Sequence, residues 1–279
     1  MDFIELQIKT SRDLADILIA ELGEIGFDTF EETDEGFNAY ILEGSFKETD
    51  VKEIIQKYSF LGIASYGTAK IPKENWNQSW ETNYHPIEIP GRCRVRASFH
   101  KPDPSFPLEI VINPKMSFGT GHHSTTYLMM ELLLDSDLQG KSVFDFGTGT
   151  GILAILAAKL GAVHIDASDI DEWCIENGME NIAINDCSNI KIQLGAVKEV
   201  KKNPSYDLAI ANINRNVLLE EMPDYAAVLP EGSKLYLSGF YEADLPVIEE
   251  KASSLGLRKT THKVREAWVA AAFEKKAVE

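Results

Sequence analysis

The sequence contains few cysteines and no pattern of metal ligands, and each shortage excludes a class of protein. Its three cysteines, Cys93, Cys174 and Cys187, are scattered and lack the C-x-x-C spacing of zinc sites, which also argues against a disulfide framework. Two of the six histidines, His122 and His123, are adjacent, and neighbouring side chains on a helix or strand point apart. We therefore expect no metal cofactor.

Long apolar segments are also missing. No stretch approaches the ~20 apolar residues that cross a bilayer. The N-terminal sequence MDFIELQIKTSRDLAD is acidic and alternating, unlike a signal or transit peptide. We expect a cytoplasmic protein without a membrane partner.

Basic residues are scarce, with 27 Lys and Arg against 44 Asp and Glu and a formal charge of −17. Such a surface repels a phosphate backbone, so we expect no direct nucleic-acid binding. Two interpretations of the acidity stay open: it keeps the chain soluble, or it attracts a basic macromolecular partner. The 279 residues, 44% of them hydrophobic, suffice for one large domain or two ordinary ones.

The first 72 residues have a hydrophobic pattern of their own. Apolar residues alternate with polar ones at Ile4, Leu6 and Ile8, which predicts a half-buried strand, and helical spacing follows from Leu14 to Ile25. The complete order, β-α-β-β-α-β, is typical of a ferredoxin-like unit. The expected elements are a strand at 4–8, a helix at 14–25, strands at 27–31 and 37–42, a helix at 51–58 and a strand at 64–71.

Residues 73–86 are polar and aromatic with little periodicity, and we expect them to connect two domains. From residue 87 to 279 strands alternate with helices, which predicts a parallel sheet covered on both faces. The last two strand-like segments, 258–264 and 267–273, are too close for a crossover helix and should pair as a hairpin. We therefore expect an α/β fold with a mostly parallel sheet and one antiparallel strand from this hairpin, preceded by a small ferredoxin-like α+β domain.

The segment VFDFGTGTGILA, residues 143–154, is a glycine-rich loop between a strand and a helix. Gly149, Gly151 and Ala154 satisfy the dinucleotide pattern G-x-G-x-x-A, but the frame that begins at Gly147 does not. Asp145 would repel a pyrophosphate and would attract the amino group or sulfonium of S-adenosylmethionine. The loop therefore favours that cofactor over NAD, although a tight turn without any ligand remains an alternative.

Two further polar residues end predicted strands. Asp169, in SDID, can accept both ribose hydroxyls of an adenosyl group; NAD would need the same contact, and a simple helix cap is the alternative. Asn212, in AIANIN, ends the fourth strand. Its side-chain oxygen can accept a hydrogen bond from an incoming amine and aim its lone pair, unless it only supports the turn.

The segment FGTGHHSTT precedes the core sheet. Residues 118–121 should form a flexible loop that folds over the cofactor as a lid, with a helix beginning near Ser124. Thr126, on the first turn of that helix, can hydrogen-bond the ligand. The alternative is that Thr126 only begins the helix.

Taken together, WNQSWETNYHPI, FGTGHHSTT, DFGTGTGILAI, SDID, ANI and EAWVAAAF resemble the ribosomal protein L-eleven (L11) methyltransferase family over nearly the whole chain. The resemblance implies a Rossmann-like methyltransferase domain with S-adenosyl-L-methionine as methyl donor, and a small N-terminal domain that recognises the ribosomal protein. The family's cofactor contacts would fall on Thr126, Gly147, Asp169 and Asn212. The chain departs from the family's GTGTHPTT and DxGCGSG, but both changes keep the glycines.

The resulting hypothesis is direct in-line methyl transfer to amino groups of ribosomal protein L11, namely lysine side chains and the N-terminal amine, with Asn212 as the catalytic residue. Three alternatives stay open. They are a methyltransferase acting on another protein or a small molecule, an NAD-dependent oxidoreductase, and a non-catalytic protein whose small domain senses a metabolite.

Overall fold

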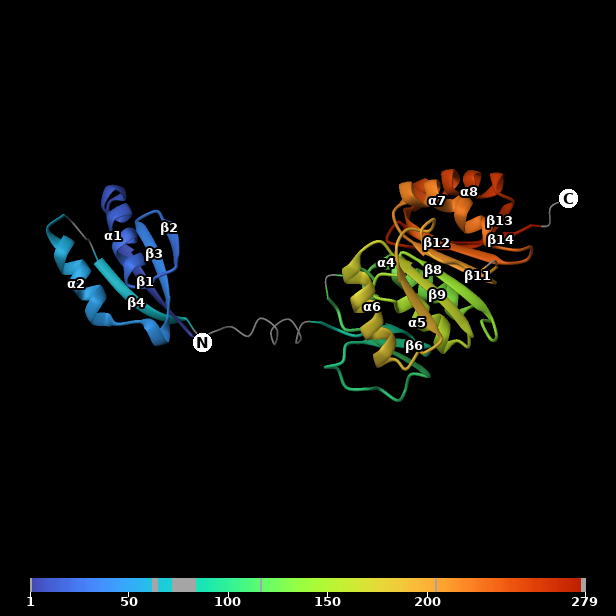
Figure 1. Ribbon diagram of the computed structural model, residues 1–279, viewed down its shortest axis with the longest axis horizontal. Helices are drawn as coiled ribbons and strands as arrows, with labels where there is room; N and C mark the ends of the chain where they lie inside the picture. Colours follow the sequence, from blue (N-terminus) through green and yellow to red (C-terminus); the bar gives the residue numbers. More distant parts are fainter. Residues whose placement is uncertain (1, 62–64, 72–83, 116, 204, 277–279) are drawn as a thin grey trace. The chain divides into compact units, whose positions relative to one another are not determined.

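The computed structural model describes residues 2–61, 65–71, 84–115, 117–203 and 205–276 (Figure 1). The chain divides into two compact units, residues 1–83 and 84–279. Most of the predicted connector, residues 73–83, lies outside the described residues. No helix in the described part of the chain is both long and apolar enough to span a membrane.

The N-terminal unit has the ferredoxin-like arrangement that the sequence predicts. Its strands pair in the order β2-β3-β1-β4, all antiparallel. Leu6 and Ile8 point into a core with apolar residues of both helices, whereas Glu5 and Gln7 face the other side of the sheet. Its elements are β1 (Phe3–Lys9), α1 (Arg12–Glu24), β2 (Thr29–Thr33), β3 (Gly36–Leu42), α2 (Glu48–Tyr58) and β4 (Ser65–Ile71).

The C-terminal unit is built on a seven-stranded sheet in the order β10-β9-β8-β11-β12-β14-β13. Of the seven strands only β14 runs opposite to the others, which confirms the predicted hairpin strand. The strands are β8 (Ser142–Phe146), β9 (His164–Asp169), β10 (Ile190–Leu194), β11 (Leu208–Asn212), β12 (Lys234–Tyr241), β13 (Leu257–Arg265) and β14 (Trp268–Lys275).

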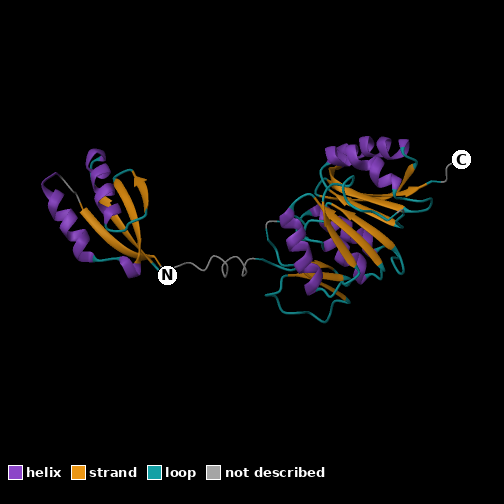
Figure 2. Ribbon diagram, viewed as in Figure 1, coloured by secondary structure: helices purple, strands orange, loops and turns teal. Residues whose placement is uncertain are grey.

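Helices cover both faces of this sheet because its strands are apolar on both sides (Figure 2). In β8, Val143 joins the core under α4 and α5, whereas Phe144 and Phe146 join the core under α7 and α8. The helices are α4 (Ser124–Leu134), α5 (Ile152–Lys159), α6 (Glu172–Ile184), α7 (Arg215–Ala227) and α8 (Leu245–Ser254). A 3₁₀ turn, Glu242–Asp244, precedes α8.

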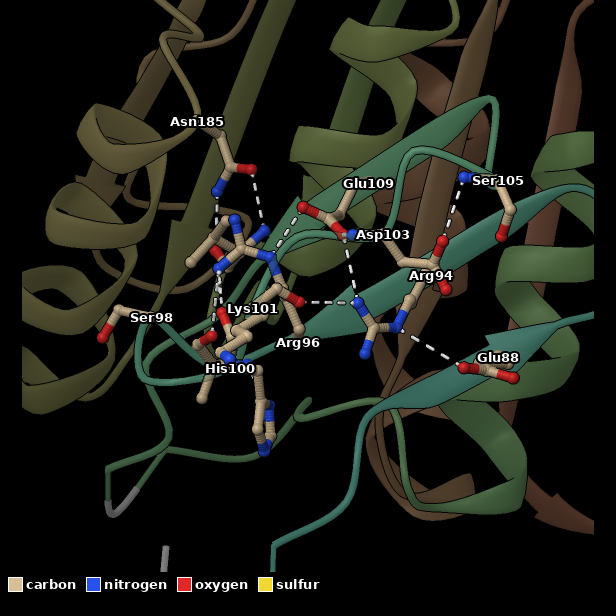
Figure 3. A network of polar contacts seen from close by, with 12 residues as sticks. Glu88, Arg94, Arg96, Ser98, His100, Lys101, Asp103, Ser105, Glu109 and Asn185 are labelled. Atoms are coloured by element: carbon tan, nitrogen blue, oxygen red, sulfur yellow. Dashed lines mark hydrogen bonds and ion pairs between the residues drawn. The ribbon is translucent and has the colours of Figure 1, made fainter.

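A third, small sheet was not predicted. Its strands β5 (Ile87–Ile89), β6 (Cys93–Arg96) and β7 (Leu108–Val111) are only three or four residues long. Figure 3 shows how charge holds them together: Glu109 pairs with Arg96 at 2.6 Å and with Arg94 at 3.4 Å. Asn185 of α6 bonds both the N–H and the carbonyl of Val111. Polar contacts between residues far apart in the sequence produce no periodic pattern of apolar residues, so this sheet could not be predicted.

Candidate active site

A cavity of about 740 Å³ opens at the carboxyl ends of the strands, where ligands of doubly wound sheets bind. Gly147 follows β8, Asp169 ends β9, Gly195 follows β10 and Asn212 ends β11, and all four line it. Because these strands are neighbours in the sheet, the predicted site residues at their ends converge on one cavity.

The glycine loop leaves no room for a side chain at Gly147 or Gly149. Gly147 and Gly149 have φ values of +67° and +54°, which L side chains rarely adopt. A Cβ atom on Gly147 would lie 2.4 Å from Cγ2 of Ile213, and one on Gly149 would lie 2.3 Å from the carbonyl oxygen of Phe118. The loop therefore presents bare backbone to the cavity.

Asp145 lies beneath this loop and does not line the cavity, which corrects the expectation of a direct ligand contact. Its side chain is 1% exposed, and its carboxylate accepts hydrogen bonds from Oγ1 of Thr148 at 2.6 Å and from the backbone N–H of Ala154. Burial raises the pKa of Asp145 to about 7, against opposing hydrogen bonds, and the nearby Asp169 charge adds to the rise. Asp145 orders the loop from below.

Thr126 and Asn212 meet, but in another way than expected. Thr126 is fully buried and does not line the cavity; its Oγ1 accepts a hydrogen bond from Nδ2 of Asn212 at 3.3 Å. Thr126 therefore positions Asn212, and its neighbours His123 and Thr125 reach the cavity instead. The Oδ1 atom of Asn212 is buried and has no hydrogen-bond partner among the described residues. An unpaired buried acceptor is costly, so a donor from a ligand would stabilise it.

Asp169 is half-buried and held by backbone donors. Its Oδ2 accepts the N–H of Gly149 at 2.9 Å, and its Oδ1 accepts the N–H of Asp171 at 3.1 Å. Each carboxylate oxygen has a second acceptor site, so Asp169 can still accept hydroxyl donors from a ligand. Asp171 caps α6 through the N–H of Trp173 at 3.0 Å. The cap of α6 is therefore Asp171, and Asp169 is not needed for it.

The segment expected to be a flexible lid is tied to the glycine loop. Backbone N–H and Oγ1 of Thr150 donate to the carbonyls of Phe118 and Gly119, at 2.9 Å and 2.5 Å. The ring of Phe118, 54% exposed, lines the cavity beside His123. The two loops therefore form one hydrogen-bonded unit.

Sequence reasoning missed several lining residues, among them Trp268, Ile213 and Glu221. Trp268 lies in EAWVAAAF, a segment that contributes to the family resemblance. Glu221 lies seven residues after Asn214 on α7, two turns along the same face. A helical period alone does not show that this face borders a cavity.

The charged residues of the lining are all acidic. Asp169, Asp171 and Glu221 line the cavity, and the described lining contains no Lys or Arg. A pyrophosphate would find no positive side chain here, whereas a cationic ligand meets three carboxylates. No group of three His, Cys, Asp or Glu residues in the described part of the chain is arranged to hold a metal ion.

The chain is similar to proteins of one family. The family model described as Ribosomal protein L11 methyltransferase (PrmA) matches residues 3–276. Relatives named Ribosomal protein L11 methyltransferase include one from Porphyromonas gingivalis, 46% identical over 96% of this chain and 92% of its own. Another, from Phocaeicola vulgatus, is 43% identical over 98% of this chain and 99% of its own.

The fold agrees with a solved structure of similar description. The crystal structure of ribosomal protein L11 methylase from Lactobacillus delbrueckii subsp. bulgaricus has a TM-score of 0.64 and 29% identity. The structural match covers 70% of this chain and 100% of the Lactobacillus chain. A family match over nearly the whole length, together with relatives above 40% identity, leaves one assignment: this chain belongs to the ribosomal protein L11 methyltransferase family.

Proposed function

We propose that the chain transfers methyl groups from S-adenosyl-L-methionine to amino groups of ribosomal protein L11, on lysine side chains and at the N-terminus. The observation that carries this proposal is Asn212. Its Oδ1 is buried and unpaired within the described residues, and the residue itself lines a cavity whose Lys, Arg, Asp and Glu content is entirely acidic. An amine donor is the missing partner that this acceptor best accommodates.

The residues present fit the cofactor. When bound, S-adenosylmethionine supplies an activated methyl group on a positively charged sulfonium. Asp169 would accept the ribose hydroxyls, and the bare backbone of Gly147 would permit close approach. The carboxylates of Asp169, Asp171 and Glu221 favour a cation electrostatically. The same lining disfavours NAD, whose pyrophosphate is anionic.

Asn212 is the proposed catalytic residue. Its Oδ1 would accept a hydrogen bond from the acceptor amine and aim the nitrogen lone pair, while Thr126 fixes the orientation of the amide from behind. Positioning of this kind removes much of the entropic barrier of a two-substrate reaction. The amine must be neutral to attack, and a free lysine has a pKa of about 10.4. We therefore expect the rate to rise with pH across the neutral range, and the mechanism invokes no metal.

The proposal extends to the N-terminal unit. Residues 1–72 would recognise the acceptor protein, with residues 73–86 as the connector and residues 87–279 as the methyltransferase domain. Residues 1–72 contain fifteen acidic and six basic side chains, more than half of the net charge of the chain. This charge favours association with a basic ribosomal protein and disfavours direct binding to nucleic acid. The proposed location is the cytoplasm.

The test is the intact mass of large-subunit ribosomal proteins after incubation with the enzyme and S-adenosylmethionine. Unmethylated L11 should gain one CH₂ unit of mass for each methyl group, and the other ribosomal proteins serve as internal controls. Asn212→Ala should add less mass than wild type at matched time. Cofactor binding without any mass gain on L11 would instead favour another protein or a small molecule as acceptor. Binding of NAD in place of S-adenosylmethionine would refute the reaction class.

A further inference from the structure

A second cavity adjoins the first. It has a volume of about 470 Å³ and lies beyond the ends of β12 and β14. Asn214, Gly239 and Trp268 line both cavities, so the two spaces meet at these residues. The five other residues that line the second cavity are Arg215, Asn216, Phe240, Tyr241 and Asp244.

The strand order shows which part of the sheet edge each cavity borders. Within the sheet the order runs β9-β8-β11-β12, so Asp169 and Asn212 stand two strands apart, roughly 10 Å at the usual strand spacing. A ligand held by Asp169 and ending at Asn212 would cover β9, β8 and β11. The second cavity begins on the opposite side of Asn212, beside β12. Asn212 lines only the first cavity, and the second joins the first at Asn214, two residues farther along the chain, so it leads toward Asn212 on the side that the first ligand leaves open.

An aromatic wall borders this route. The rings of Tyr241 and Trp268 have centroids 4.0 Å apart at 32°, and the rings of Trp268 and His123 form a T-shaped pair with centroids 4.8 Å apart. Tyr241 is 50% exposed, whereas Trp268 is partly buried against the core. An aromatic pair at a cavity wall suits a ligand with an apolar stem and a polar end.

The wall is fixed from outside by charge. Nη1 of Arg215 donates to Oδ1 of Asp244 at 2.6 Å, and Oδ2 of Asp244 accepts the backbone N–H of Tyr241 at 3.3 Å. Arg215 begins α7 and Asp244 ends the 3₁₀ turn after β12. Asp244 thus holds the backbone of Tyr241 at the second cavity and neutralises the guanidinium of Arg215.

From this arrangement we propose that Tyr241, stacked on Trp268, binds the alkyl chain of the acceptor amine and determines the KM for the acceptor. This inference rests on the proposed function and adds the binding surface for the second substrate. A lysine stem is four methylenes long and covers an aromatic face while its nitrogen stays free. The stem would lie along Tyr241 and Trp268, and the nitrogen would reach Asn212.

The experiment is steady-state kinetics of the full-length enzyme with ribosomal protein L11 as the varied substrate. Tyr241→Ala should raise the KM for L11 about fivefold to tenfold and leave kcat within about twofold, because stacking on an aromatic ring contributes to binding and not to the reacting atoms. Tyr241→Phe keeps the ring and should behave as wild type. Val247→Ala, an exposed change on neighbouring α8, is the matched control.

The Kd for S-adenosylmethionine separates a binding role of Tyr241 from a structural one, because a distorted site would also bind the cofactor more weakly. Calorimetry should give the same Kd for S-adenosylmethionine in wild type and Tyr241→Ala. An unchanged KM for L11 in Tyr241→Ala, or an equal rise in the Kd for S-adenosylmethionine, would overturn the inference. If Tyr241→Ala melts below wild type, Tyr241→Leu repeats the comparison with the apolar volume kept.

Two outcomes with wild-type enzyme separate the proposed function from the role of Tyr241. Wild-type enzyme that transfers no methyl group to L11 refutes the proposed function. Wild-type enzyme that methylates L11 with a KM insensitive to the ring at position 241 refutes only the role of Tyr241.

Discussion

Replacing Asp145 with asparagine should change how stability depends on pH. The Asp145 carboxyl is 1% exposed, and burial raises its pKa from an ordinary 3.8 to about 7. The folded protein therefore holds this proton between about pH 4 and pH 7, whereas the unfolded chain releases it. Stability from this group is complete below pH 4, falls as pH rises toward 7, and stays constant above it. An amide does not titrate, so Asp145→Asn removes this dependence.

The size of the effect follows from the shift. Each pKa unit corresponds to about 1.4 kcal/mol, so a rise from 3.8 to about 7 amounts to about 4 kcal/mol over the whole range. Between pH 5 and pH 7 about 2 to 3 kcal/mol of this should appear. Asp145→Asn also disturbs the hydrogen bonds to Thr148 and Ala154, at a cost of about 1 kcal/mol that does not vary with pH.

The assay is chemical denaturation of the full chain at pH 5, 6, 7 and 8, for wild type and for Asp145→Asn. Subtracting the two free energies of unfolding cancels all groups that titrate equally in both proteins. The wild-type advantage should shrink by about 2 to 3 kcal/mol between pH 5 and pH 7 and then level off. A difference that stays constant, or that grows with pH, would refute a buried Asp145 of raised pKa.

Three other changes test the site and its loops. Asp169→Ala should weaken S-adenosylmethionine binding at least about tenfold in calorimetry, because two charge-assisted hydrogen bonds are lost; an unchanged Kd would remove Asp169 from the cofactor site. Asn212→Ala should slow single-turnover methyl transfer more than it weakens cofactor binding, and an unaltered rate would exclude the amine-aiming role. Gly239→Ala should lower stability by more than about 2 kcal/mol, since its Cβ would lie 2.0 Å from the carbonyl oxygen of Ile213 at a φ of +96°. Gly232→Ala, at a φ of +79° with nothing within 4 Å, is the matched control and should cost only about 1 kcal/mol in thermal melting; equal losses would contradict the close contact.

Most of the fold was predictable because its elements are defined by local periods. Alternation at Leu6 and Ile8 marked β1, and the strand expected to lead into the glycine-rich loop is β8. The antiparallel strand β14 followed from chain length alone, since too few residues separate it from β13 for a crossover. The sheet β5-β6-β7 has no such signal. Its strands are short, and the contacts of Glu109 and Asn185 that hold it span long sequence separations.

Positions of side chains at the site were predictable only where strand ends determine them. Asp169 and Asn212 end β9 and β11, so their approach to one cavity follows from the parallel sheet. Thr126 faces the same region, but whether it meets the ligand or Asn212 depends on burial that only packing decides. Tyr241 gave no signal, because its exposure depends on how β12 ends against β14.

The preference for S-adenosylmethionine over NAD rests on different residues than the sequence suggested. A carboxyl group with a pKa of about 7, 1% exposed, carries only part of a charge at neutral pH and is a weak source of repulsion for a pyrophosphate. In the proposed function the discriminating charge lies instead on Asp169, Asp171 and Glu221, which line the cavity without any Lys or Arg in the described lining. Asp145 and Asp169, 24 residues apart, thus have different roles. Asp145 accepts a hydrogen bond within the loop from Thr148, and Asp169, held by the N–H of Gly149, is the carboxylate that the proposed function assigns to the ligand.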